Sequence, residues 1–81
     1  SEHLVSHPGV DKISFTGSTA AGRRIAAVAG AGLKRVTLEL GGKSAAIVLD
    51  DVNFAQIVPS LLSSATLNNG QACAAQTRWL V

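Results

Sequence analysis

The clearest strand pattern in this chain lies in the stretch Val36-Thr37-Leu38-Glu39-Leu40-Gly41-Gly42-Lys43-Ser44, and the other strands and helices are predicted on either side of it. The apolar residues of this segment alternate with polar ones up to Leu40, which predicts a strand with one apolar face. Glu39 then lies on the opposite face, near the carboxyl end of the strand. The Gly41-Gly42 pair is expected to let the backbone turn sharply. A carboxylate at this position is suited to act as a general base, and a solvated glutamate at a strand end is the alternative.

A second strand is predicted upstream, over Lys12–Thr16, because Ile13 and Phe15 fall on one face. Gly17-Ser18-Thr19 follows as a strand-to-helix turn, in which Ser18 is a good N-cap. The helix that begins there is expected to end at Gly30 or Gly32. Its apolar stripe consists of Ala21, Ile25, Val28 and Ala29.

The glycine turn before this helix is suited to bind an anion. A helix N-terminus offers unpaired N–H groups and the positive end of the helix dipole. The alternative interpretation is a turn that only connects the strand to the helix and binds nothing. The spacing Gly17-x-x-x-x-Gly22-Arg23-Arg24 departs from the phosphate-binding loop of nucleotide hydrolases, which needs Lys and then Ser or Thr where the two arginines stand. Nucleotide hydrolysis is therefore disfavoured.

Downstream, the same alternation of strand and helix is predicted once more. The apolar run Ala45–Leu49 suits a strand covered on both faces. Asn53 and Gln56 form a pattern like a capping box at the start of a helix that continues to about Leu67. Pro59 is expected to kink this helix or delay its start. Gly70 ends it, and Gln76–Val81 begins another strand, so the order strand–helix–strand–strand–helix–strand predicts the α/β class.

The only cysteine of the chain lies in Asn68-Asn69-Gly70-Gln71-Ala72-Cys73-Ala74-Ala75. The small side chains around Cys73 leave its sulfur sterically open. A free thiol has a pKa of about 8.5, so a nucleophilic cysteine needs exposure and a nearby helix N-terminus, cation or base. A buried, small, apolar cysteine is the alternative.

The amino-acid composition argues against several classes of function. The 81 residues are 47% hydrophobic and 15% charged, which indicates a globular chain whose autonomous core would be marginal at this length. A net charge of +2 without aromatic residues among the basic ones argues against nucleic-acid binding. No apolar run suits a membrane span. A single cysteine suits a reducing compartment, and we expect a cytoplasmic protein. His3 and His7 are assigned to a surface loop, and no metal site is expected because Pro8 follows and no acidic or Cys partner is near.

Three motifs together resemble those of the NAD(P)-dependent aldehyde dehydrogenase superfamily. Leu38–Ser44 and Gly70–Cys73 are similar to its two active-site signatures, and Phe15–Thr19 is similar to its cofactor-binding turn. They stand in the order and approximate spacing of the family. The resemblance covers essentially the whole chain. Since members of that family are several times longer, it implies an internal segment.

The resemblance implies a partial three-layer α/β unit cut from a larger fold. Residues 1–40 would be the end of a Rossmann-like cofactor-binding domain, and residues 41–81 the start of the catalytic domain. It further implies NAD or NADP as cofactor, a small-molecule aldehyde as substrate and a homo-oligomeric parent enzyme. Cys73 would be the nucleophile, its N–H an oxyanion donor, and Glu39 the base that activates water. Thr16, Gly17 and Ser18, with Leu40 and Gly41, would contact the cofactor.

Two roles for this chain compete with that of an enzyme segment. A non-redox thiol hydrolase would need a histidine base for Cys73, but only His3 and His7 are present. The other is a chain of 81 residues with no activity of its own, because the second oxyanion donor of the family lies outside it. If the resemblance to aldehyde dehydrogenases is right, the side chains of Glu39 and Cys73 are expected to open to a shared cleft.

Overall fold

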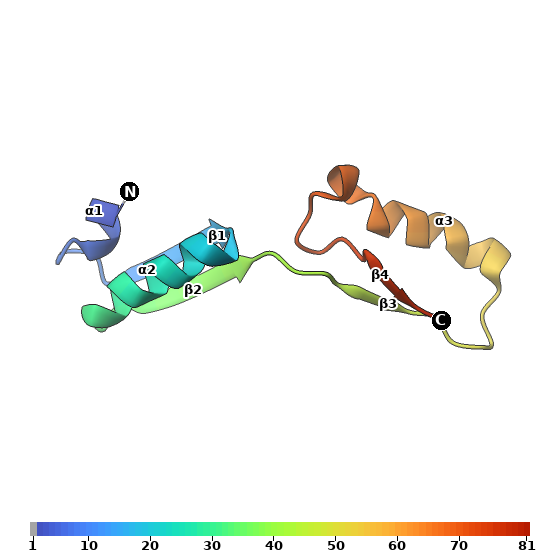
Figure 1. Cartoon of the computed structure of the whole chain (residues 1–81), viewed down its shortest axis with the longest axis horizontal. Helices are drawn as coiled ribbons and strands as arrows, with labels where there is room; N and C mark the ends of the chain where they lie inside the picture. Colours follow the sequence, from blue (N-terminus) through green and yellow to red (C-terminus); the bar gives the residue numbers. More distant parts are fainter. Residues whose placement is uncertain (1) are drawn as a thin grey trace. The chain divides into compact units, whose positions relative to one another are not determined.

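The computed structural model describes residues 2–81, in which the predicted order of strands and helices is found from Lys12 onward (Figure 1). The elements are α1 (Glu2–Ser6), β1 (Lys12–Gly17), α2 (Thr19–Ala31), β2 (Arg35–Leu40), β3 (Ala45–Ile47), α3 (Phe54–Ala65), the 3₁₀ turn η1 (Leu67–Gly70) and β4 (Arg78–Leu80). None of the helices in this described part is long and apolar enough to cross a membrane.

The chain divides into two compact units, the first reaching Gly41 and the second running from Gly42 to Val81. Each unit holds two parallel strands connected through a helix, β1–α2–β2 in the first and β3–α3–β4 in the second. Parallel neighbours require such a crossover, because a tight hairpin can only join antiparallel strands. The α/β class is therefore confirmed. The boundary falls beside the predicted one, while the identity of the two domains stays a prediction.

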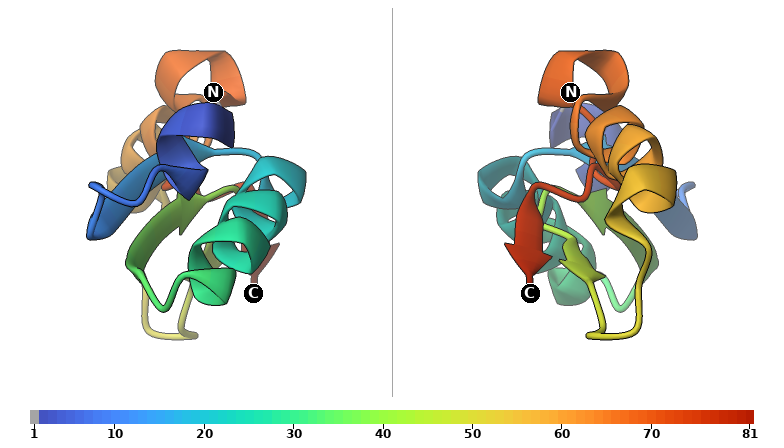
Figure 2. Two further views of the ribbon diagram at one scale, coloured as in Figure 1. Left: turned by 90° about the vertical axis from the view of Figure 1, so that its left-hand side faces the viewer. Right: turned by 90° about the vertical axis from the view of Figure 1, so that its right-hand side faces the viewer.

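The first unit is built on the β1–β2 pair, whose register runs from Lys12 opposite Arg35 to Gly17 opposite Leu40. Burial alternates along both strands, as their sequences predict. Helix α2 lies along this pair, which is visible in two directions (Figures 1 and 2). Gly22 is buried there, and a Cβ added to it would lie 2.7 Å from Leu40 Cδ2. The missing side chain of Gly22 thus allows helix and strand to approach closely.

Both ends of α2 are capped. Ser18 is the N-cap, and its Oγ accepts a hydrogen bond from the Ala21 N–H at 3.2 Å, as predicted. At the other end Gly32 is the C-cap, and the N–H of Lys34 donates to the Ala29 carbonyl at 3.0 Å. The left-handed residue of this closing turn is Leu33, with φ of 53°, instead of a glycine. This conformation costs an L-residue roughly 1–2 kcal/mol.

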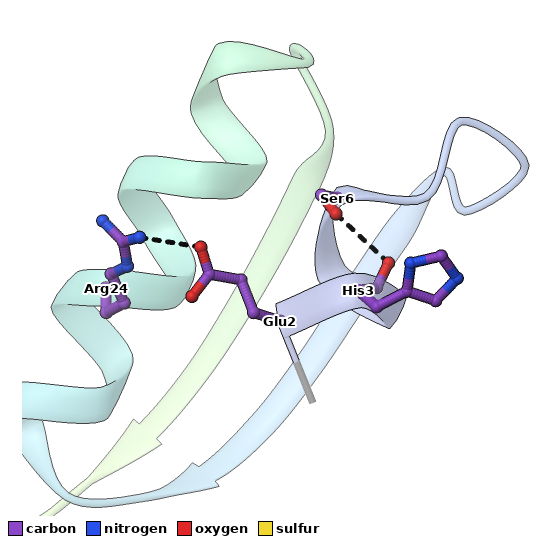
Figure 3. Close-up of polar contacts among 4 residues, drawn as sticks. All are labelled: Glu2, His3, Ser6 and Arg24. Atoms are coloured by element: carbon purple, nitrogen blue, oxygen red, sulfur yellow. Dashed lines mark hydrogen bonds and ion pairs between the residues drawn. The ribbon is translucent and has the colours of Figure 1, made fainter.

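The prediction of a surface loop before β1 is wrong for Glu2–Ser6, which form α1. So short a helix is not stable alone, since nucleation fixes several residues for one hydrogen bond. Here α1 is held by contacts distant in sequence. Glu2 pairs with Arg24 of α2 at 2.7 Å (Figure 3). The Lys34 ammonium donates to the carbonyl of Val5, within α1, and to that of His7, just after it.

The second unit departs from its prediction at three places. Ala46 is buried, but Ile47 is 71% exposed, so β3 is not covered on both faces within this chain. Asn53 is the N-cap of α3 without a side-chain hydrogen bond, and the Gln56 N–H donates to the Asn53 backbone carbonyl, so the capping box is wrong. Pro59 lies inside this helix, which begins at Phe54, so the predicted delay of its start is wrong and the predicted kink stays a prediction.

The predicted sharp turn at Gly41-Gly42 is also wrong. Residues 41–44 form neither a turn nor a bend, and neither glycine has a positive φ. A Cβ added at either position would meet no atom within 4 Å. Among residues 2–81, no local steric requirement explains the two adjacent glycines.

Candidate functional site

Five of the predicted site residues lie at the carboxyl edge of the β1–β2 sheet and the turn that follows. In the strand register Thr16 is opposite Glu39, and Gly17 is opposite Leu40. Ser18 follows directly and begins α2. Thr16, Gly17, Ser18 and Glu39 are exposed, and Leu40 is half-buried. In α/β sheets, ligands bind outside the carboxyl ends of the strands, so this edge is where a ligand is expected.

The first turn of α2 supplies hydrogen-bond donors at this edge. Within residues 2–81 no acceptor faces the backbone N–H groups of Thr19 and Ala20. The Ser18 hydroxyl accepts the Ala21 N–H and keeps its own proton for another acceptor. These donors, with the positive end of the α2 dipole, suit an anionic group such as a phosphate.

A groove of about 420 Å³ opens beside this turn, between α1, β1 and α2. Its lining is predominantly apolar, with one charged residue of each sign. The lining residues are Glu2, Leu4, Val5, Ile13, Ser14, Phe15, Ala21, Arg24, Ile25 and Val28. Leu4 is 62% exposed although it lines the groove. The groove therefore offers an apolar surface close to donors for an anion.

Gly17 is sterically constrained by its own strand. A Cβ built on it would lie 2.6 Å from Cζ of the Phe15 ring, a groove residue. Any larger residue at position 17 forces this ring to move. The glycine therefore keeps both the backbone and the groove wall in place.

The loop before Cys73 has an uncommon backbone. Asn68, Asn69 and Gly70 follow each other with φ of 50°, 57° and 75°. Asparagine and glycine are the residues that tolerate this left-handed region best, which explains the Asn-Asn-Gly sequence. The loop is fixed beyond Cys73, where Ala75 is buried and the Gln76 N–H donates to the Ser64 carbonyl of α3 at 3.2 Å.

Cys73 itself stands in a turn closed by the Ala75 N–H, which donates to the Ala72 carbonyl at 3.1 Å. Its thiol is free and exposed, so the alternative of a buried apolar cysteine is wrong. For the Cys73 N–H, the part of the chain from Glu2 onward provides no acceptor. The Ser44 hydroxyl donates to the Cys73 carbonyl at 3.5 Å, a long contact that links the two predicted signatures.

The predicted site residues divide between the units. Thr16, Gly17, Ser18, Glu39, Leu40 and Gly41 belong to the first unit, and Cys73 belongs to the second. A common cleft for Glu39 and Cys73 stays a prediction. Sequence reasoning missed the contributions of Gly22, Lys34 and Ser44. Only Gly22 carried a signal, because a glycine inside a helix pattern usually has a packing reason.

The two histidines interact with each other and with their own segment. Their rings meet edge to face with centroids 5.7 Å apart, and His7 Nδ1 accepts the Gly9 N–H at 3.1 Å. Both belong to the first unit and Cys73 to the second. Across residues 2–81 no group of three His, Cys, Asp or Glu side chains could hold a metal ion.

Comparison with known proteins relates the whole chain to one family. The aldehyde dehydrogenase family model matches residues 1–81. Geranial dehydrogenase of Castellaniella defragrans is 63% identical over 78 residues, and the chloroplastic betaine aldehyde dehydrogenase of Beta vulgaris is 49% identical. Both alignments cover 96% of this chain and 16% of the relative. The chain thus spans about a sixth of the length of the curated relatives it matches.

Comparison with solved structures relates the chain to the same family. A mutant of aldehyde dehydrogenase C from Pseudomonas syringae, in complex with NAD+ and octanal, matches with a TM-score of 0.92 and 46% identity, over 96% of this chain and 16% of that one. The NAD+ complex of an aldehyde dehydrogenase from Bacillus cereus matches with a TM-score of 0.88 and 39% identity, over 94% of this chain and 16% of that one.

Proposed function

Because this chain belongs to the aldehyde dehydrogenase family, we propose that it is part of an enzyme oxidising an aldehyde to a carboxylic acid with NAD(P)+. Cys73 is the nucleophile, Glu39 is the general base, and Thr16-Gly17-Ser18 with Leu40 and Gly41 receive the cofactor. One observation carries the proposal. The exposed thiol of Cys73 lies beside its own backbone N–H, which has no acceptor within residues 2–81, in a signature that the family model covers.

Cys73 acts first. Its thiolate forms a C–S bond to the aldehyde carbon, and the carbonyl electron pair moves onto oxygen, which becomes an alkoxide. The Cys73 N–H, which has no acceptor within residues 2–81, is free to donate to that oxygen. NAD(P)+, when bound, supplies the acceptor for the hydride that the carbon loses. The carbon then remains on Cys73 as a thioester.

Glu39 acts in the second half. Its carboxylate takes a proton from a water molecule whose oxygen attacks the thioester carbon. The C–S bond breaks, the carboxylic acid leaves, and the sulfur takes the electron pair back as thiolate. Glu39 is exposed at the end of β2, so it can return its proton to solvent. The two residues are needed at different stages of the cycle.

The first unit fits the cofactor in two ways. The Thr19 and Ala20 N–H groups, which have no acceptor among the described residues, and the Ser18 hydroxyl suit the pyrophosphate. The apolar groove between α1 and α2 suits the flat adenine ring of the same molecule, because its lining is apolar and it lies along the helix whose N-terminus holds the phosphates. Relatives solved with NAD+ support the same cofactor class.

The unit that reaches Gly41 is then the end of the cofactor-binding domain, and the unit from Gly42 on is the start of the catalytic domain. We also infer a cytoplasmic location from the single cysteine, and a homo-oligomeric enzyme from the family resemblance. The 81 residues alone are expected to show no turnover, since they contribute one oxyanion donor and a sixth of the length of the relatives.

The function is tested in a full-length aldehyde dehydrogenase that carries these 81 residues, called the parent enzyme below. It should reduce NAD+ or NADP+ only when an aldehyde is added, and a thiol reagent that modifies Cys73 should stop the reaction. The isolated chain, assayed in parallel, should give no reduced cofactor. Thiol-dependent hydrolysis of an ester without any cofactor requirement would favour the hydrolase instead.

The cofactor assignment predicts a specific effect of Gly17→Val in the parent enzyme. The new side chain collides with the Phe15 ring and obstructs the turn, so the Kd for the cofactor should rise by about tenfold or more. The alkylation rate of Cys73 should not change. Gly30→Val is the matched control, because a Cβ at Gly30 meets nothing within 4 Å. Equal cofactor affinity in both variants would contradict the assignment.

A further inference from the structure

Lys34 is a half-buried cation whose partners are backbone carbonyls. Its Nζ donates to the Val5 carbonyl at 2.9 Å and also to the His7 carbonyl. Val5 belongs to the last turn of α1, where a helix leaves its carbonyls without intrahelical donors, and His7 follows directly after the helix ends at Ser6. A cation at that end is favoured by the helix dipole as well. Lys34, just before β2, therefore fixes the end of a helix far upstream.

The other attachment of α1 is weaker. Glu2 and Arg24 meet at 2.7 Å, but their side chains are 59% and 68% exposed (Figure 3). Exposed ion pairs of this kind contribute little, because water and salt screen them. A helix of only Glu2–Ser6 has almost no stability of its own. The position of α1 consequently depends chiefly on Lys34.

That position matters because α1 supplies one wall of the groove. Glu2, Leu4 and Val5 line it opposite residues of α2. Val5 is also the residue whose carbonyl Lys34 binds, so the same residue touches both the anchor and the groove. If the hydrogen bonds from Lys34 are lost, α1 is free to move away from α2. The apolar surface that the groove offers to the adenine ring is then reduced.

We propose that Lys34 is a positioning residue for cofactor binding, which holds α1 as the wall of the groove that receives the adenosine half. The inference rests on the proposed function of the first unit. Lys34 does not line the groove, so it acts through α1 and not through contact with the cofactor. It should therefore govern cofactor affinity and leave the chemical steps unchanged.

The test compares Lys34→Met, Lys34→Arg and Arg35→Met in the parent enzyme. Arg35→Met is the matched control, because it removes a positive charge at the next residue. The Arg35 side chain is exposed and, within residues 2–81, makes no hydrogen bond, unlike Lys34. Lys34→Met should raise the Kd of both the cofactor and 5′-AMP by about tenfold, the scale of a lost charge-assisted hydrogen bond. The value of kcat at saturating cofactor should stay as in the wild type. Lys34→Arg should restore most of the affinity, and Arg35→Met should change neither constant.

A second measurement avoids substitution altogether. In the wild-type parent enzyme, 5′-AMP should slow hydrogen exchange of the Glu2–His7 amides, because α1 borders the groove. Unchanged exchange in this segment, unchanged Kd in Lys34→Met, or a parallel fall of kcat in that variant would each overturn the inference. If the wild-type enzyme binds neither cofactor nor 5′-AMP, it is the proposed function that fails.

Discussion

Cys73→Ala is expected to abolish aldehyde-dependent cofactor reduction in the parent enzyme, with a loss of more than about 10⁴-fold in kcat. The chain contains no other cysteine, so no second thiol in this segment can form the C–S bond. The thiol is exposed and lies in a short turn between Ala72 and Ala75. Alanine fits that turn without a clash, so the loss should be chemical and not structural.

The measurement combines steady-state turnover with cofactor titration. Cys73→Ala should bind NAD(P)+ with the affinity of the wild type, because the cofactor donors belong to the first unit. Ala74→Ser is the matched control, since Ala74 is exposed in the same turn. It should keep most of the activity. Substantial turnover in Cys73→Ala would show that the nucleophile lies elsewhere.

The sequence was sufficient to predict an element where a local residue pattern is compatible with only one type of secondary structure. Alternation over Val36–Leu40 predicted β2, and Ser18 after Gly17 predicted the start of α2. A crossover helix between the two strands then makes them parallel. The register that places Thr16 beside Glu39 comes from the structure.

What could not be predicted depends on contacts between distant residues. The helix α1 exists because Lys34 and Arg24 hold it, and nothing in Glu2–Ser6 alone indicates this. The left-handed Leu33 replaces the expected glycine at the end of α2, where three closing hydrogen bonds outweigh the local preference. Ser44 meets Cys73 only because β3 and β4 pair.

Glu39→Gln separates the two halves of the proposed reaction. Acylation and hydride loss depend on the Cys73 thiolate and the oxyanion donors, whereas hydrolysis of the thioester needs an activated water. Glutamine keeps the size of the exposed side chain at the end of β2 but cannot take a proton. A general base contributes about 10²–10⁴-fold, so turnover in the parent enzyme should fall within that range.

The first turnover should nevertheless survive in this variant. Rapid mixing with aldehyde and NAD(P)+ should give a burst of reduced cofactor equal to the number of active sites. Mass analysis of the quenched protein should find the acyl group on Cys73, because its formation outpaces its hydrolysis. Asp51→Asn, which removes an exposed carboxylate from the turn before α3, is the control and should turn over like the wild type.

The burst also distinguishes the proposed role from the other task that a carboxylate could perform. If Glu39 instead helps to ionise Cys73, C–S bond formation itself slows when the carboxylate is removed. The burst would then decline in parallel with turnover, and no acyl adduct would accumulate. That result would assign Glu39 to activation of the nucleophile and contradict its role in hydrolysis. A burst of wild-type rate followed by slow turnover and a trapped thioester is the outcome expected here, because a base that acts only on water is not needed until the hydride has left.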